Sequence, residues 1–415
     1  MTAEDPGAER RVALVTTLVG LVAFVALAAW LVPWDPVPGG RLEPADPLSV
    51  FTPEQVERAE AFSHHARILS WSSLAVSLAV ACWLGLTRRG RALFGRLPGP
   101  WWVQVPLAVA VVDLLRRVVT LPFAVLLWRA RVDEGLSTQD AAAFFSDLVK
   151  GELLDIAVTS LGLLAVLACA RRWRRAWPAI AGAGLGVLVL AGSFVYPVVV
   201  EPLFNEFEPL PDGPLRSEIM RLADEEGVVV DDVLVADASR RTTTLNAYVS
   251  GFGGTRRVVV YDTLVDGLPQ DQALSVVAHE LAHARHGDVV TGSLLGAAGA
   301  LVGVGLLALV LGRVRQRGGP GLADPAVVPL VLVLLALASL VSSPVSNTVS
   351  RQIETRADVD ALRATDDPAA FIAMQTQLAL RSLSDPTPPA WSQFWFGSHP
   401  TGLTRIALAQ RLAND

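Results

Sequence analysis

Residues Ser275–Asp288 read SVVAHELAHARHGD, and residues 289–312 directly after them read VVTGSLLGAAGALVGVGLLALVLG. The first stretch holds three of the six histidines of the chain. The second is long enough to cross a membrane, which takes about 20 mainly apolar residues in a helix. The sequence therefore predicts a cluster of histidines directly before the start of a membrane helix.

The whole chain has the composition of a polytopic membrane protein. Of its 415 residues, 52% are hydrophobic and 18% are charged, and the mean hydropathy is +0.44. Soluble domains are less apolar and more highly charged. About seven stretches are long and apolar enough to span a membrane. They cover residues 12–33, 68–87, 103–129, 153–170, 178–199, 289–312 and 325–346.

Three further features of the composition limit the function. The first apolar stretch follows two arginines but lacks a small-residue cleavage site, which favours an uncleaved membrane anchor. The net charge of −6 offers no basic face, so no nucleic-acid partner is expected. Cys82 and Cys169 lie inside apolar stretches, where packing and not a disulfide is the expected role.

The third apolar stretch is unusual because it contains Asp113, Arg116 and Arg117. Spacings of three and four residues place Asp113 on one helical face with both arginines. Two interpretations are open at this point. The group is either a self-neutralising set of charges at a helix end, or it faces a water-filled interior, where charged groups inside membranes usually point.

The motif HELAH places His279 and His283 four residues apart. On a helix their Cβ atoms lie about 5–6 Å apart, so both can bind one tetrahedral zinc at about 2.0–2.1 Å. Glu280 stands beside such a metal and can take a proton from the attacking water, the general-base role of a metalloprotease. The alternative is a chance HExxH on a surface helix. The apolar flanks argue against it, because buried histidines need partners, which a metal supplies.

A catalytic zinc needs a third protein ligand. The seventh span returns the chain to the membrane face from which HELAH enters, and it ends at SNTVSRQIETRADVDAL (346–362). Glu354 and Asp358 share a helical face there, and one of them can bind the metal while the other holds a histidine N–H. The residues alone do not rank the two, and ordinary helix pairing with Arg351 is a third possibility. His286 is a spare ligand or, as we expect, a hydrogen-bonding group at the helix–membrane junction.

Ordered motifs along nearly the whole chain resemble those of the integral-membrane zinc metalloproteases of the CAAX prenyl protease type 1 family. The motifs are EPLFNEFEPLPDGPLR (Glu201–Arg216), LNAYVSGFGGTRRVVVYDTL (Leu245–Leu264), HELAH, SRQIETRAD (Ser350–Asp358) and GSHPTGLTRI (Gly397–Ile406). Two short segments depart from the family pattern, namely GLS (Gly135–Ser137) and the threonines of TTTLNAY. These departures concern substrate binding and leave the metal motifs intact.

The resemblance implies a role for each matching residue. It implies that His279, His283 and Glu354 bind one Zn²⁺ per chain, that Glu280 is the catalytic base, and that Asp358 holds a ligand histidine. Further matches are Asn246 and Tyr248, on an edge strand that binds substrate backbone, and His399 and Arg405, near the substrate or the tetrahedral intermediate. Without the resemblance, His399 is interpreted as a solvated loop histidine.

The expected fold is mainly α: about seven transmembrane helices that enclose a chamber, with a small α+β zinc-metalloprotease domain between the fifth and sixth spans. The helix 214–227 and strands within 233–239, 244–252 and 256–262 are predicted for that domain, with GFGGT (Gly251–Thr255) as a hairpin turn. The predicted parts are a five-span region (1–199), a catalytic region (200–288), a transmembrane hairpin (289–346) and a helical C-terminal part (347–415).

The expected function is a membrane-embedded zinc metalloendopeptidase that acts on peptides or proteins within or near the lipid bilayer, in CAAX-type C-terminal processing or in quality control of membrane proteins. The oligomeric state is not predicted. One alternative is a catalytically silent, chaperone-like membrane protein, against which the intact Glu280 argues. The other is a transporter, which has no use for HELAH and a distant glutamate.

Loop charges predict the orientation, because cytoplasmic loops carry an excess of Lys and Arg. The arginine-rich loops follow the second, fourth and sixth spans, which places the metal motifs outside the cytoplasm. The resemblance implies the opposite, because the eukaryotic relatives face the cytosol. The arginines are Arg88, Arg89, Arg91 and Arg96, then Arg171, Arg172, Arg174 and Arg175, then Arg313, Arg315 and Arg317.

Overall fold

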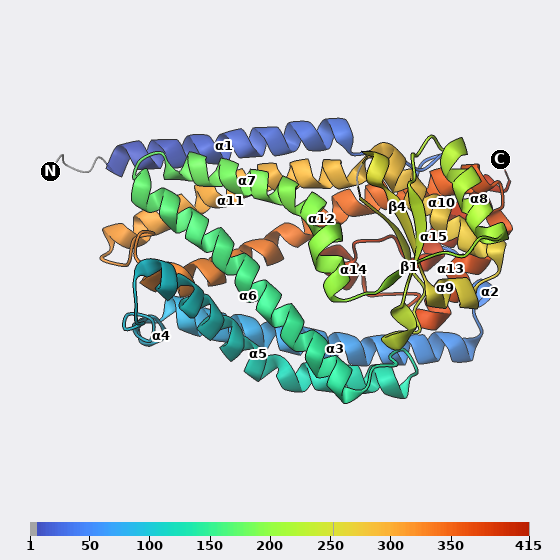
Figure 1. The fold of residues 1–415 in the computed structure, drawn as a ribbon, viewed down its shortest axis with the longest axis horizontal. Coiled ribbons are helices and arrows are strands. Elements are labelled where there is room, and N and C mark those ends of the chain that lie inside the picture. The colour runs from blue at the N-terminus through green and yellow to red at the C-terminus, as the bar shows by residue number, and fades with distance from the viewer. Residues whose placement is uncertain (1–5, 252, 415) are drawn as a thin grey trace.

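The structure is a computed structural model that describes residues 6–251 and 253–414. Long helices run side by side through most of the molecule, and a small sheet with shorter helices caps one end of them (Figure 1). The chain is therefore mainly α with a compact α+β part, as the sequence predicts.

Six helices in the described part of the chain are long and apolar enough to span a membrane. They coincide with six of the predicted stretches. The remaining stretch forms α5 (Trp101–Asp133), a helix of similar length that is interrupted by charge. The six are α1 (Pro6–Leu31), α3 (Pro53–Leu86), α6 (Ala141–Arg172), α7 (Trp177–Val195), α11 (Asp288–Gln316) and α12 (Val328–Thr365).

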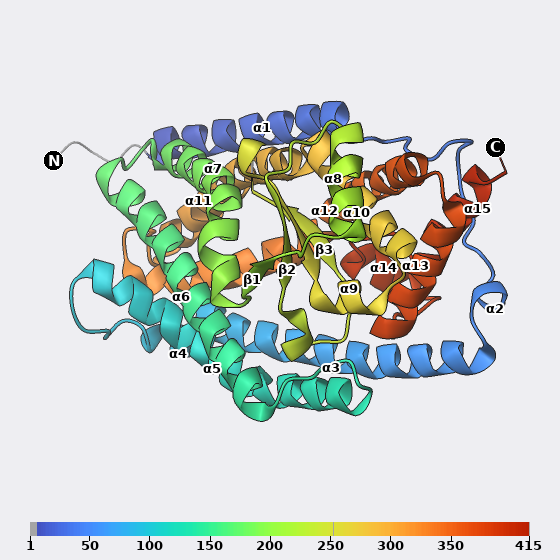
Figure 2. The same cartoon turned by 45° about the vertical axis from the view of Figure 1, so that its right-hand side comes forward.

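The long helices form a ring. Around it, α12 packs on α3, α3 on α5, α5 on α6, α6 on α7, α7 on α11, and α11 returns to α12 (Figure 2). Far from the sheet, the ring closes in one apolar core that includes Leu84, Val109, Leu167 and Val331. Outside the ring, α1 lies along α11 so closely that a Cβ on Gly305 would stand 2.2 Å from Thr17 Oγ1. Small residues permit such close helix contacts in membranes.

The charged group of α5 lies in the middle of that helix and not at its end. One face of α5 exposes Val111, Leu114, Leu115 and Val118, as a lipid-facing surface does. The charged side chains project from the opposite face and bind the neighbouring helices. Arg116 Nε donates to Ser77 Oγ on α3 (2.9 Å) and Arg117 Nε to Glu152 Oε2 on α6 (2.6 Å), while Arg116 also pairs with Asp113 (3.2 Å).

The sheet has the strand order β1-β2-β4-β3, with β2 and β4 parallel and the other pairs antiparallel. β3 and β4 form within the predicted segments, β2 begins one residue before its predicted segment, and the very short β1 is not predicted. Gly251, at the start of the β3–β4 turn, has φ +90°, and a Cβ there would meet the Thr255 carbonyl oxygen at 2.3 Å. The strands are β1 (Phe207–Pro209), β2 (Asp232–Ala236), β3 (Ala247–Ser250) and β4 (Arg257–Tyr261).

One face of the sheet packs on helices α8 (Pro214–Glu225) and α10 (Gln270–His286), through buried residues such as Ile219, Val258 and Leu281. Shorter helices complete this end of the molecule, namely α2 (Pro47–Val50), α9 (Asp262–Gly267), α13 (Pro368–Ser382), α14 (Ala390–Phe396) and α15 (Gly402–Leu412). The short helix α4 (Arg88–Ala92) lies at the opposite end.

The membrane hairpin joins the two parts of the fold. Gly287 takes the left-handed conformation (φ +64°), ends α10 and lets α11 begin at Asp288. α12 then returns as one continuous helix from the membrane to Thr365. Its last turns lie against α10, as the sequence predicts for the segment that contains Glu354.

The loop charges generate a prediction about orientation. All three arginine-rich loops lie at the end of the helices away from the sheet. A single orientation, with this end in the cytoplasm, therefore agrees with the excess of Arg in all three loops. In a bacterial host, a C-terminal fusion should be active with a reporter that works only outside the cytoplasm, and inactive with one that works only in the cytoplasm. The reverse pattern would overturn the orientation derived from the charges.

Candidate metal centre

Helices α10 and α12 bring three potential metal ligands together. His279 Nε2 and His283 Nε2 lie 3.2 Å apart, with their rings nearly perpendicular (89°). Glu354 reaches them from α12, with Oε2 3.2 Å from His279 Nε2 and Oε1 3.6 Å from His283 Nε2. One ligand atom from each of the three residues can be chosen so that all lie within 4.8 Å of one another.

This geometry fits a zinc ion. Ligand atoms at about 2.0–2.1 Å from a tetrahedral zinc are about 3.3 Å from each other, close to the observed nitrogen–nitrogen distance. Ring nitrogens that face each other repel unless a proton or a cation lies between them. Glu354 Oε2 is buried and has no well-formed hydrogen bond within the described residues. A cation between the three side chains would satisfy both histidine nitrogens and this oxygen together.

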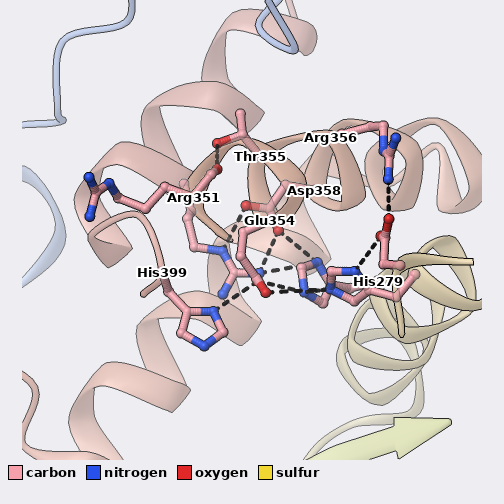
Figure 3. A network of polar contacts seen from close by, with 10 residues as sticks. His279, Arg351, Glu354, Thr355, Arg356, Asp358 and His399 are labelled. Atoms are coloured by element: carbon pink, nitrogen blue, oxygen red, sulfur yellow. Dashed lines mark hydrogen bonds and ion pairs between the residues drawn. The ribbon is translucent and has the colours of Figure 1, made fainter. Parts of the chain in front are cut away.

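Asp358 holds the first histidine. Its Oδ1 lies 2.9 Å from His279 Nδ1, and Arg405 Nε donates to its Oδ2 at 2.8 Å. Asp358 is fully buried, whereas Glu354 points at the Nε2 atoms (Figure 3). Burial lowers the pKa of His279, but hydrogen bonds with Asp358 and Glu354 raise it to about 9. The geometry therefore favours Glu354 as the ligand and Asp358 as the group that orients His279.

Asp288 holds the second histidine, and the sequence analysis did not assign it a role. Its Oδ2 lies 2.9 Å from His283 Nδ1, and its Oδ1 pairs with Arg356 of α12. Each histidine thus has an aspartate at Nδ1, and each aspartate has an arginine behind it. The sequence did carry a signal for Asp288, since it follows a glycine at the end of HELAHARHG. A glycine in the left-handed conformation ends α10 and directs Asp288 back toward His283.

Glu280, the predicted base, is half-buried on α10 beside the two histidines. Burial raises the pKa of its carboxyl group, although the nearby His279 and His283 act in the opposite direction. A carboxylate with a raised pKa accepts a proton more readily at neutral pH. The environment of Glu280 therefore suits a general base.

His399 and Arg405 both reach this centre. His399 Nδ1 lies 2.8 Å from Glu354 Oε2, and its side chain remains 61% exposed. Arg405 is largely buried, with Nη2 3.4 Å from His279 Nδ1. His286, in contrast, binds Asp360 Oδ2 through Nε2 (2.7 Å) and is not among the three clustered ligands. A hydrogen-bonding role thus fits His286 better than that of a spare ligand.

The predicted substrate-binding residues lie along the sheet edge. Among the described strands, β3 is the last of the sheet, with β4 as its neighbour, and α10 packs against β3. Asn246 is exposed directly before this strand, and Tyr248 lies within it. The Tyr248 hydroxyl lies 3.5 Å from Glu201 Oε2, at the end of the fifth predicted span.

The two segments that depart from the family pattern contact each other. Thr242 Oγ1 donates to the Leu136 carbonyl (3.2 Å) and Thr243 Oγ1 to the Gly135 carbonyl (2.8 Å), and Ser137 forms a β-bridge with Thr242. Together they line a cavity of about 280 Å³ with Arg58 and Leu380. The departures are therefore one local feature of the structure.

Comparison with known proteins agrees with this architecture. Residues 43–206 match the model of the CAAX prenyl protease N-terminal region, described as having five membrane helices, and residues 209–413 match peptidase family M48. The metalloprotease YhfN of Bacillus subtilis is 29% identical over 89% of this chain and 89% of its own length. The Arabidopsis thaliana CAAX prenyl protease 1 homolog is 29% identical over 66% of this chain and 65% of its own.

The fold also matches a solved structure, Ste24p of S. mikatae, with a TM-score of 0.78 and 20% identity over 96% of this chain and 99% of the other. The fold and the two consecutive family matches define a multi-pass membrane metalloprotease. The chain belongs to the CAAX prenyl proteases within peptidase family M48.

The ligand set can be tested by metal analysis of purified variants. Glu354→Ala should lower bound zinc about as strongly as His279→Ala or His283→Ala, because each removes one of three donors. Asp358→Asn should retain more zinc than Glu354→Ala, since it changes only the orientation of His279. Full zinc in Glu354→Ala would transfer the ligand role to another group.

Asp288 can be tested in the same way. Asp288→Ala should weaken zinc affinity by about 10–100-fold, the usual cost of removing a carboxylate that orients a ligand histidine. Asp360→Ala is a matched control, because Asp360 holds His286, which lies outside the ligand cluster. Equal zinc affinities of the two variants in a chelator competition would contradict the role of Asp288.

Proposed function

We propose that this membrane metalloprotease is a zinc-dependent endopeptidase with its active centre at His279, His283 and Glu354. The observation that carries the proposal is the convergence of these three side chains, with both histidines held at Nδ1 by carboxylates. This leaves both Nε2 atoms free for a metal. A zinc ion held there supplies an acidified water and polarises the scissile carbonyl group.

The residues of the chain carry the proton transfers. Glu280 accepts the proton of the attacking water and later donates it to the leaving amine. Arg405 and His399 lie at the same centre and provide N–H groups for the charge that develops on the carbonyl oxygen. Asp358 keeps His279 in the tautomer whose Nε2 is available.

The substrate is proposed to bind as an added strand along β3, beside Asn246 and Tyr248. Strand addition depends on backbone hydrogen bonds and tolerates varied side chains. The ring of helices and the polar face of α5 support a water-accessible interior between the helices. Such an enclosure suits flexible or unfolded segments and excludes folded domains.

The physiological reaction is proposed to be C-terminal processing of CAAX type or the turnover of membrane proteins. The relatives named CAAX prenyl protease 1 favour the first, and a bacterial relative along most of the chain is compatible with the second. We propose that the active centre lies outside the cytoplasm, and the loop charges support this orientation.

Glu280→Gln is the decisive variant. It should keep the fold and wild-type zinc content, because Glu280 is not in the ligand cluster, and it should lower hydrolysis of fluorescein-labelled casein by about 10²-fold or more. Zinc content and initial rates in detergent give both measurements. Unchanged hydrolysis would refute the proposed base. Loss of zinc would instead assign Glu280 a structural role.

A further inference from the structure

Arg351 has no part in the reaction described above, yet it lies one helical turn before Glu354 on α12. Residues three apart share a helical face. Arg351 Nη1 donates to the Gly397 carbonyl at 2.6 Å and to the Gln393 carbonyl at 3.2 Å, and Nη2 donates to Thr348 Oγ1 at 3.0 Å. One guanidinium therefore binds the backbone at the end of α14.

These carbonyls lie at the end of α14, where the last carbonyl groups of a helix run short of backbone N–H donors and a nearby cation is stabilising. The Gln393 carbonyl also accepts the Gly397 N–H at 3.1 Å, so Arg351 is its second donor. The Gln393 side chain lies against this turn, since a Cβ on Gly397 would lie 2.3 Å from Gln393 Oε1. The side chain of Gln393 is in turn occupied, because its Nε2 donates to the His399 carbonyl at 2.6 Å.

His399 depends on this backbone for its position. Its side chain is 61% exposed, so packing does not hold it, yet its Nδ1 lies 2.8 Å from Glu354 Oε2. Arg351 extends from α12 on the side where His399 lies (Figure 3). Because Arg351 and Glu354 both belong to α12, the loop that carries His399 is fixed relative to the same helix that carries the glutamate.

We propose that Arg351 is a positioning residue, which holds the Gly397–Thr401 loop so that His399 meets Glu354. The expected effect of Arg351 on hydrolysis rests on the proposed peptidase function. Nη1 donates to both carbonyls while Nη2 binds Thr348 Oγ1, and only a forked guanidinium presents two separate nitrogens to these two sites, because lysine has a single ammonium group. The effect of Arg351 on hydrolysis should therefore act through His399 and leave metal binding intact.

A double-mutant cycle tests this dependence with fluorescein-labelled casein. Arg351→Ala should lower the maximal rate by about 10–100-fold, the scale expected when a catalytic group is misplaced by about 1 Å. His399→Ala should cause a similar loss, and the double variant should be no slower than His399→Ala alone. Zinc content should stay at the wild-type level in all three variants.

Hydrogen exchange gives a readout that does not depend on activity. Arg351→Ala should speed amide exchange in residues 393–401 at least several-fold, since the Gln393 and Gly397 carbonyls lose their contacts with α12 while Asn347 still holds the Trp395 carbonyl. Arg411→Ala is the matched control. Arg411 also binds backbone carbonyls, those of Pro38 (3.0 Å), Gly40 (2.9 Å) and Arg41 (2.9 Å), and its loss should leave exchange in 393–401 and the rate unchanged.

Several results would overturn the inference: a wild-type rate in Arg351→Ala, an additive loss in the double variant, loss of zinc, or unchanged exchange in 393–401. If Arg351→Ala does not fold, Arg351→Lys replaces it, with a smaller loss expected in the same pattern. If casein hydrolysis by the wild type is insensitive to Glu280→Gln, the proposed function fails, and the exchange comparison still decides whether Arg351 holds the loop.

Discussion

The contact between Glu354 and the two histidines is the point on which the rest of the structure depends. It joins a helix that emerges from the membrane to a helix that packs under a sheet. The ring nitrogens of two histidines and a carboxylate repel one another unless a cation or a proton lies between them. Rigid surrounding structure is needed to hold them this close. The apolar packing of α10 under the sheet and the continuous α12 supply that rigidity.

Each of the two histidines is held by an aspartate that is itself paired with an arginine. Asp358 and Arg405 support His279, while Asp288 and Arg356 support His283. Buried carboxylates are stable only when they are paired and hydrogen-bonded. Each pair therefore satisfies its own charges and at the same time leaves one histidine nitrogen directed at the metal position.

The sequence predicted what depends on local pattern. Apolar runs of spanning length became helices, HELAH became part of α10 with His279 and His283 on one face, and the apolar run Val258–Val260 became β4. The return of the chain through the last span also predicted Glu354 and Asp358 beside the histidines, whereas the preference for Glu354 as the ligand came from the resemblance and from the geometry of the site. Arg356 and the contacts of Arg351 were missed, because each depends on residues distant in the chain. Asp288 was missed although it lies only five residues from His283, because its contact depends on the turn at Gly287. The short strand β1, with a proline at its end, has no alternating pattern to reveal it.

The left-handed residue Gly287 has a mechanical consequence. It leaves no linker between the helix that carries His283 and the membrane helix that begins at Asp288. A change in the tilt of α11, as a bilayer of different thickness imposes on a spanning helix, moves the carboxylate of Asp288 relative to the imidazole that it orients. A change in the lipid environment is thus transmitted to the metal centre through one residue, Gly287.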